Sequence, residues 1–92
     1  MAVKVISFYQ EGCMGCDEQT PILREAEKEL GIKIEEIDAV KNPEYIQKYR
    51  LRVTPTIIVL DGDEVRERME GLVHREDLEA AVRRHLPEPL PR

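Results

Sequence analysis

The sequence contains little cysteine, no long apolar run and no excess of positive charge. Only two of its 92 residues are cysteine, which excludes the multi-bridge framework of a small secreted domain. No apolar run approaches the ~20 residues that span a bilayer, so we expect no membrane segment. The formal net charge of −5 argues against nucleic acid as a partner, because such binding depends on lysine and arginine at phosphates.

The length and composition are those of one small globular unit. Hydrophobic residues make up 41% of the chain and charged residues 36%, a balance typical of a folded domain. We expect one domain over residues 1–86 and a proline-rich tail over residues 87–92. The amino terminus leads directly into a strand pattern without the apolar core of a signal peptide, which favours a cytoplasmic location. We also expect a monomer.

Apolar periodicity predicts alternating strands and helices. Apolar and β-branched stretches predict strands at residues 3–9, 32–38, 56–60 and 64–70. Helical spacing predicts helices at about residues 16–30 and 75–86, and Asn42-Pro43 should cap and open a short helix. Strands separated by helices run parallel, whereas the turn at residues 61–63 joins an antiparallel hairpin. The predicted fold is α/β, ordered β-α-β-α-β-β-α, with a four-stranded mixed sheet flanked by helices.

The two cysteines stand three residues apart where the first strand gives way to the first helix. Cys13 lies at the first turn, where free backbone N–H groups and the helix dipole favour a thiolate and should lower the pKa of this cysteine. Cys16 lies on the same side of the helix and can attack a mixed disulfide formed at Cys13. This spacing at a helix start is what a redox pair requires.

A metal half-site is the alternative interpretation of the same spacing. A closed zinc site needs four ligands, and the remaining soft candidates are His74 and His85, eleven residues apart. We expect both histidines to be solvated at the surface, His74 as the N-cap of the last helix and His85 at its polar end. A zinc site within one chain is therefore disfavoured, while a cluster shared between two chains stays open.

A proline directly before a buried strand adds a second signal. Pro55, in Val53-Thr54-Pro55-Thr56, marks either the first residue of the strand or a special turn, because proline cannot pair in the middle of a sheet. Four further features occur along the chain in the order that one known family shows. They are the segment FYQEGCMGC, Pro21 five residues after the second cysteine, the turn DGDEV, and Gly71. With these features the chain resembles the thioredoxin family in its shorter, glutaredoxin-sized form, over about residues 3–86.

The resemblance implies a protein-disulfide reductase that needs no cofactor or metal. Cys13 would be the nucleophile and Cys16 the resolving thiol, and the two would close a disulfide. Pro55 would be cis and pack against this pair, and the backbone of Thr54 would bind an extended substrate segment. The substrate-docking surface would consist of Gly12, Met14, Val53, Thr54, Pro55, Gly71 and Leu72. The implied partners are disulfide-containing proteins and an electron donor, either a thioredoxin reductase-like enzyme or a low-molecular-weight thiol.

The segment around the cysteines departs from the family's usual sequence. Thioredoxins resemble W-C-G-P-C and glutaredoxins C-P-Y-C, whereas here Gly12 precedes the first cysteine and Met14-Gly15 separates the pair. The direction of electron flow therefore stays open. A glutathione-linked, glutaredoxin-like enzyme that needs only Cys13 is one alternative. A non-enzymatic carrier of metal or an iron–sulfur cluster, or a binding module, is another.

Acidic residues surround the cysteines, but the buried aspartate of thioredoxins is replaced by Ser7. Serine is no effective base at neutral pH, so either water or a nearby carboxylate, Glu11 or Asp17, would accept the proton of Cys16, or the resolving step would be slower. Solvated surface charge is the simpler interpretation of these two carboxylates. Together with Glu18 they oppose a thiolate at Cys13 and predict docking of neutral or basic partners.

Overall fold

The computed structural model describes residues 2–86, so the predicted tail at residues 87–92 lies outside the described part. Its strands are β1 (Val3–Tyr9), β2 (Ile34–Asp38), β3 (Thr56–Asp61) and β4 (Glu64–Glu70). Its helices are α1 (Met14–Leu30), α2 (Glu44–Tyr49) and α3 (Arg75–Arg83). This is the element order that the sequence predicts. Between residues 2 and 86, no helix is long and apolar enough to cross a membrane.

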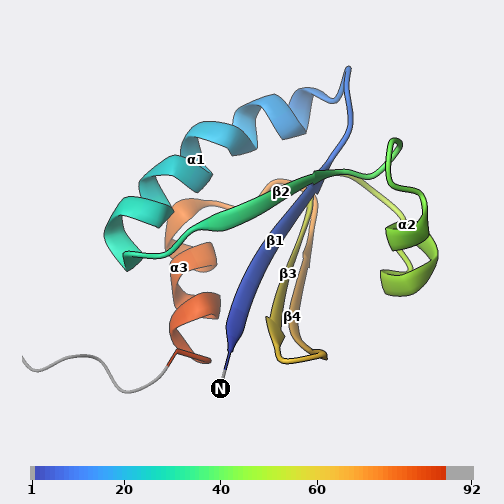
Figure 1. Ribbon diagram of the computed structural model, residues 1–92. Helices are drawn as coiled ribbons and strands as arrows, with labels where there is room; N and C mark the ends of the chain where they lie inside the picture. Colours follow the sequence, from blue (N-terminus) through green and yellow to red (C-terminus); the bar gives the residue numbers. More distant parts are fainter. Residues whose placement is uncertain (1, 87–92) are drawn as a thin grey trace, which may run out of the picture.

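The strands form one mixed sheet in the order β2-β1-β3-β4 (Figure 1). β1 pairs with β2 in parallel, because α1 carries the chain back across the sheet between them. β3 runs antiparallel to β1, and the tight turn at Gly62 makes β4 antiparallel to β3. The expected four-stranded mixed sheet is therefore confirmed. β1 lies in its middle and delivers its carboxyl end to the start of α1.

The helices cover the two faces of the sheet unequally (Figure 1). α1 and α3 pack side by side on one face, which we call the α1/α3 face. The short α2 covers the opposite face, which we call the α2 face. Alternation along β1 sends Val5 to the α1/α3 face, and Ile6 and Phe8 to the α2 face. The described residues thus build a hydrophobic cluster on each side of the sheet.

The start of α1 and the start of β2 differ from the predicted boundaries. The helix begins at Met14 rather than Cys16, because Cys13 is its N-cap and its sulfur accepts a hydrogen bond from the backbone N–H of Cys16. At the other end Gly31 is the C-cap, as predicted, with a φ of 66°. Ile32 N still donates to the Glu27 carbonyl, so β2 begins only at Ile34.

The predicted capping of α2 and the predicted end of α3 were wrong. Asn42 does not cap α2: Pro43 holds the N-cap position, and the Asn42 side-chain amide donates to the Asp38 carbonyl at 2.9 Å. α3 ends at Arg83 rather than Leu86, although turn-like hydrogen bonds continue as far as residue 86. The helix stops where His85 turns back toward β4.

Candidate active site

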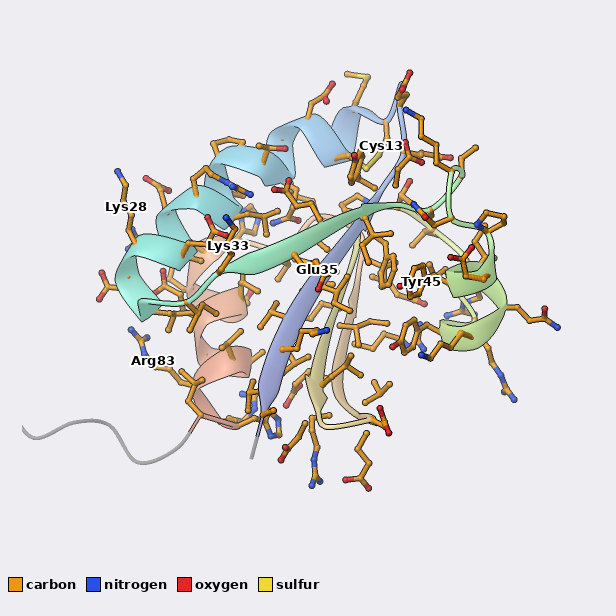
Figure 2. The ribbon with its side chains drawn as sticks, in the orientation of Figure 1. Cys13, Lys28, Lys33, Glu35, Tyr45 and Arg83 are labelled. Atoms are coloured by element: carbon orange, nitrogen blue, oxygen red, sulfur yellow. A yellow bond between two sulfur atoms is a disulfide. The ribbon has the colours of Figure 1, made fainter. Side chains whose placement is uncertain are left out.

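The cysteines lie where β1 ends and α1 begins, at one edge of the sheet. Figure 2 labels Cys13 at this junction, beside the loop that leads into β3. Cys13 and Cys16 form a disulfide with a Cα–Cα distance of 5.2 Å. Cys16 is only 6% exposed, whereas Cys13 is half-buried and faces the rim. Cys13 is therefore the more accessible residue of the pair.

Two donors surround the sulfur of Cys13. The backbone N–H of Cys16 donates to it at 3.1 Å, and the Thr54 hydroxyl lies within donating distance at 3.5 Å. The Thr54 carbonyl oxygen is also 3.5 Å away and could accept from Cys13 only when that residue is a protonated thiol. After reduction, the two donors would stabilise the thiolate that attacks disulfides.

The loop before β3 lies against the start of α1 through Pro55. The Thr54–Pro55 peptide bond is cis, the geometry that the resemblance implies, and Pro55 is buried. A Cβ placed on Gly15 would lie 3.2 Å from Cδ of Pro55, closer than most such contacts. Gly15 therefore allows the first turn of α1 to approach the proline ring. The sequence reasoning noted Gly15 only as an unusual residue between the cysteines and missed this packing role.

The segment after β4 is bonded to the loop that carries Pro55. Gly71 adopts a φ of 85°, a left-handed conformation that favours glycine, and its N–H donates to the Pro55 carbonyl at 2.8 Å. Leu72, the next residue, is 38% exposed. The structure thus joins the segments of two predicted docking residues, Pro55 and Gly71, although they lie in different loops.

The other predicted docking residues are exposed near these segments. Gly12 and Met14 flank Cys13 in the chain, and the Met14 side chain is 79% exposed. Val53 is exposed beside Thr54, and both line a groove of about 130 Å³ between the loop before β3 and α2. The exposed side chains of Met14 and Val53, near a reactive sulfur, offer apolar contact to a partner protein.

A second cavity, of about 200 Å³, lies next to Cys16 on the α1/α3 face. Ser7 lines it and is 2% exposed, so the position of the family's buried acid is indeed buried. The sequence reasoning named two carboxylates for this region, and the structure adds a third. The carboxylates on the cavity wall are Glu11, Asp17 and Glu36. Glu36 was missed because it belongs to β2, where it is the register partner of Ser7 in the parallel pair.

Ion pairs moderate the charge around the cysteines. The Glu11 carboxylate lies 3.5 Å from the Lys41 ammonium, which offsets part of the negative charge expected on this rim. Arg52, just before the proline loop, donates to Glu70 at 2.8 Å. This hydrogen bond lowers the pKa of the Glu70 carboxyl. The pair connects the segment before Pro55 with the segment before Gly71.

The histidines do not join the cysteines. Over residues 2–86, no group of three or more histidine, cysteine, aspartate or glutamate side chains could hold a metal ion. His74 is exposed at the N-cap of α3, as predicted. The prediction for His85 was wrong: it is half-buried, and its Nε2 lies 2.7 Å from the Glu67 carboxylate.

A dithiol of this kind stores two electrons and returns them by disulfide exchange, which places the protein among the thiol–disulfide oxidoreductases. The sequence model of the thioredoxin family matches residues 2–84. A thioredoxin of Bacillus subtilis is 35% identical over 86 residues, covering 91% of this chain and 83% of that protein. The chain therefore belongs to the thioredoxin family, and Cys13–Cys16 is its CxxC active site.

Solved structures agree with this assignment. Thioredoxin-2 of a malaria parasite superposes with a TM-score of 0.85 at 28% identity, covering 91% of this chain and 84% of that one. Thioredoxin 1 of Thermosipho africanus gives a TM-score of 0.77 at 26% identity, with coverages of 89% and 92%. Both matches extend over nearly the whole described chain. The protein is a thioredoxin-type protein-disulfide reductase.

Proposed function

We propose that Cys13 is the nucleophile and Cys16 the resolving thiol in the reduction of protein disulfides. The observation that carries this proposal is the unequal burial of the two sulfurs. Cys13 is half-buried at the rim with two donors on its sulfur, and Cys16 is 6% exposed beneath it. An incoming disulfide meets Cys13 first, and Cys16 then attacks the Cys13 sulfur once that sulfur is bound to the substrate.

The reaction consists of two exchanges. The Cys13 thiolate attacks one sulfur of the substrate disulfide, so that a Cys13–substrate bond forms and the substrate S–S bond breaks. The departing substrate sulfur takes up a proton. The Cys16 thiolate then attacks the Cys13 sulfur, which closes the Cys13–Cys16 disulfide and releases the second substrate sulfur. The substrate gains two electrons and two protons, and the protein is left oxidised.

The cavity beside Cys16 supports a route for the proton of the resolving thiol. Cys16 must lose this proton before it can attack, and Ser7 cannot accept it at neutral pH. The cavity of about 200 Å³ extends from Cys16 past Asp17 and Glu36, and its walls are polar enough to hold water. Water in this cavity and these carboxylates accept the proton in place of the family's buried aspartate.

The partners follow from the rim. Met14, Val53 and Leu72 offer exposed apolar contacts, and the backbone of Thr54 beside them suits an extended segment of a disulfide-containing protein. The acidic residues Asp17 and Glu18 near the cysteines favour neutral or basic segments. Either a thioredoxin reductase-like enzyme or a low-molecular-weight thiol restores the dithiol.

The redox midpoint of the Cys13–Cys16 pair tests the direction of this reaction. The purified protein is equilibrated with graded thiol buffers, and the fraction of disulfide is measured by alkylation and mass spectrometry. A midpoint near about −270 mV, the thioredoxin value, supports a reductant of protein disulfides. A midpoint above about −200 mV assigns an oxidising or glutathione-coupled role instead. If no disulfide forms at any potential, the proposal fails.

Trapping tests the order of the two thiols. A Cys16→Ser variant should accumulate mixed disulfides through Cys13 when it is incubated with a disulfide-containing protein such as insulin. The matched Cys13→Ser variant should accumulate none, because the buried Cys16 sulfur is out of reach of a protein substrate. Equal trapping by both variants would contradict the assigned roles.

A further inference from the structure

Gln19 is a fully buried polar side chain in the helix that carries the active-site cysteines. It lies one turn after Cys16 and is 1% exposed, on the same stripe as the buried Leu23. Burying a primary amide costs free energy unless its donor and acceptor both find partners. An aliphatic residue would be the ordinary choice on this stripe, so the glutamine must satisfy something that an aliphatic side chain cannot.

Its partner is the backbone of Val73, 54 residues further along the chain. The Gln19 amide donates to the Val73 carbonyl at 3.0 Å, and the Val73 N–H donates to the Gln19 amide oxygen at 2.9 Å. Val73 lies between β4 and α3, outside any strand. The side-chain amide therefore takes the place of a neighbouring strand and satisfies both backbone polar groups of one buried residue. We call this pair of hydrogen bonds the Gln19 clamp.

The clamped segment is the one that completes the rim of the active site. Two residues before Val73, Gly71 donates to the Pro55 carbonyl at 2.8 Å. Pro55 follows Thr54, whose hydroxyl lies 3.5 Å from the sulfur of Cys13. The segment at residues 71–73 is thus bonded to the proline loop at one end and to α1 at the other. Hydrogen bonds thus connect α1, the segment at residues 71–73 and the proline loop around the disulfide. The Gln19 clamp is the link between this segment and α1.

We propose that Gln19 is a positioning residue that sets the distance between the cysteine helix and the segment at residues 71–73, and so controls docking of protein disulfides at Cys13. The inference rests on the proposed docking surface, because that segment carries Gly71 and the exposed Leu72. Without the clamp, the segment stays tied to the proline loop but is free to move away from α1. The Cys13 sulfur keeps its donors, since Gln19 makes no hydrogen bond to Cys13 or Thr54 in the described contacts.

The test compares two substrates in Gln19→Met, a variant of similar size that loses both hydrogen bonds. Insulin needs the docking surface, whereas a small disulfide such as bis(2-hydroxyethyl) disulfide reacts with the same two cysteines without that surface. We expect kcat/KM for insulin to fall about fivefold, the size of one net hydrogen bond, mainly through KM. The rate with the small disulfide should fall less, so that the ratio of the insulin rate to the small-disulfide rate drops. Gln47→Met, the same change at an exposed position of α2, is the matched control.

Further measurements separate a positioning role from a structural one. Amide hydrogen exchange should show lost protection at Val73 in Gln19→Met, while Gly71 keeps its bond to Pro55. Gln19→Glu keeps the acceptor but cannot donate as a carboxylate, so it should lose insulin activity too, even if the methionine variant folds poorly. A lowered stability with an unchanged ratio of the two substrate rates would overturn the proposal.

A docking variant distinguishes failure of this inference from failure of the proposed function. Leu72→Ala removes an apolar contact from the same segment without touching the clamp. If Leu72→Ala weakens insulin reduction but Gln19→Met does not, only the clamp inference is wrong. If neither variant affects insulin, the docking surface lies elsewhere; the clamp inference and the proposed docking surface then both fail, while the roles of Cys13 and Cys16 are decided by the trapping experiment.

Discussion

The two faces of the sheet are built from the same strands but pack differently. On the α2 face the buried cluster is made of aliphatic and aromatic side chains: Ile6, Phe8, Ile37, Tyr49, Ile58 and Leu60. Tyr45 and Tyr49 stack there with ring planes 1° apart, and the ring of Phe8 is 5.7 Å from each. On the α1/α3 face the aliphatic cluster is accompanied by buried polar side chains, among them Ser7, Gln19 and Glu79. The buried Thr56 lies on the same side of β3 as Ile58 and Leu60, so the α2 face also holds a polar side chain.

The difference separates stability from function. Apolar contacts stabilise in proportion to buried area and have no preferred direction, so the α2 cluster supports the sheet chiefly through burial. Buried polar groups demand partners at defined distances and angles, so each one restricts the geometry around it. Two of these buried polar side chains, Ser7 and Gln19, line the cavity next to Cys16. The α1/α3 face therefore carries the cavity beside the active-site cysteines. Three substitutions test this comparison of the two faces.

The largest expected effect is on the α2 face, from Phe8→Ala. Phe8 is fully buried, and its loss should lower the free energy of unfolding by ~3–5 kcal/mol. Urea unfolding of the oxidised protein measures this change, and Phe8→Leu is a milder control on the same site. The ratio of insulin rate to small-disulfide rate should stay unchanged in the folded fraction. A changed ratio would show that the α2 face also positions the site.

Gly15→Ala should change stability less than Phe8→Ala does but should slow the reduction of insulin. Alanine favours a helix over glycine by about 0.5–1 kcal/mol, which offsets the cost of the close approach to Pro55. Stability should therefore change by less than about 1 kcal/mol. Reduction of insulin should slow several-fold, because the new methyl group displaces the proline loop from Cys13. Unchanged kinetics with a clear gain in stability would show that the loop absorbs the contact without consequence.

The smallest effect is expected on β4, where the residues that follow α3 contact it, from Glu67→Gln. The hydrogen bonds of Arg84 and His85 to Glu67 lower the pKa of its carboxyl. A carboxyl with a lowered folded pKa stabilises the protein above its unfolded value of about 4.3, and this contribution is lost as pH falls through the folded value. Wild type should be slightly more stable than the variant at neutral pH, as for other exposed ion pairs.

Unfolding midpoints measured between about pH 7 and pH 3 check the sign of this effect. The difference between wild type and Glu67→Gln should shrink in the acidic part of this range. Glu25→Gln, on the exposed side of α1, is the control for a general loss of negative charge. A difference that grows with acid would contradict the assigned direction of the Glu67 pKa.

Features that depend on near neighbours were predictable from the sequence. The order of strands and helices follows from apolar periodicity, and the αL cap at Gly31 follows from the sterics of a helix end. The cysteine pair at a helix start was visible because three residues of spacing place both thiols on one side. Even local reasoning failed where two neighbours competed: Asn42 bonds back to Asp38 instead of capping α2.

Features that join distant segments were decided only by the tertiary structure. Gln19 meets Val73, Glu36 lies beside Ser7, and His85 turns to Glu67, over separations that no periodicity records. A residue without a side chain is favoured at position 15 only because Pro55 packs against Gly15. The sequence by itself determined the chemistry of Cys13 and Cys16, because a helix start and a spacing are local properties. The register of the strands and the packing of the helices decided which polar groups surround that chemistry, because buried partners must meet at hydrogen-bonding distance wherever they lie in the chain.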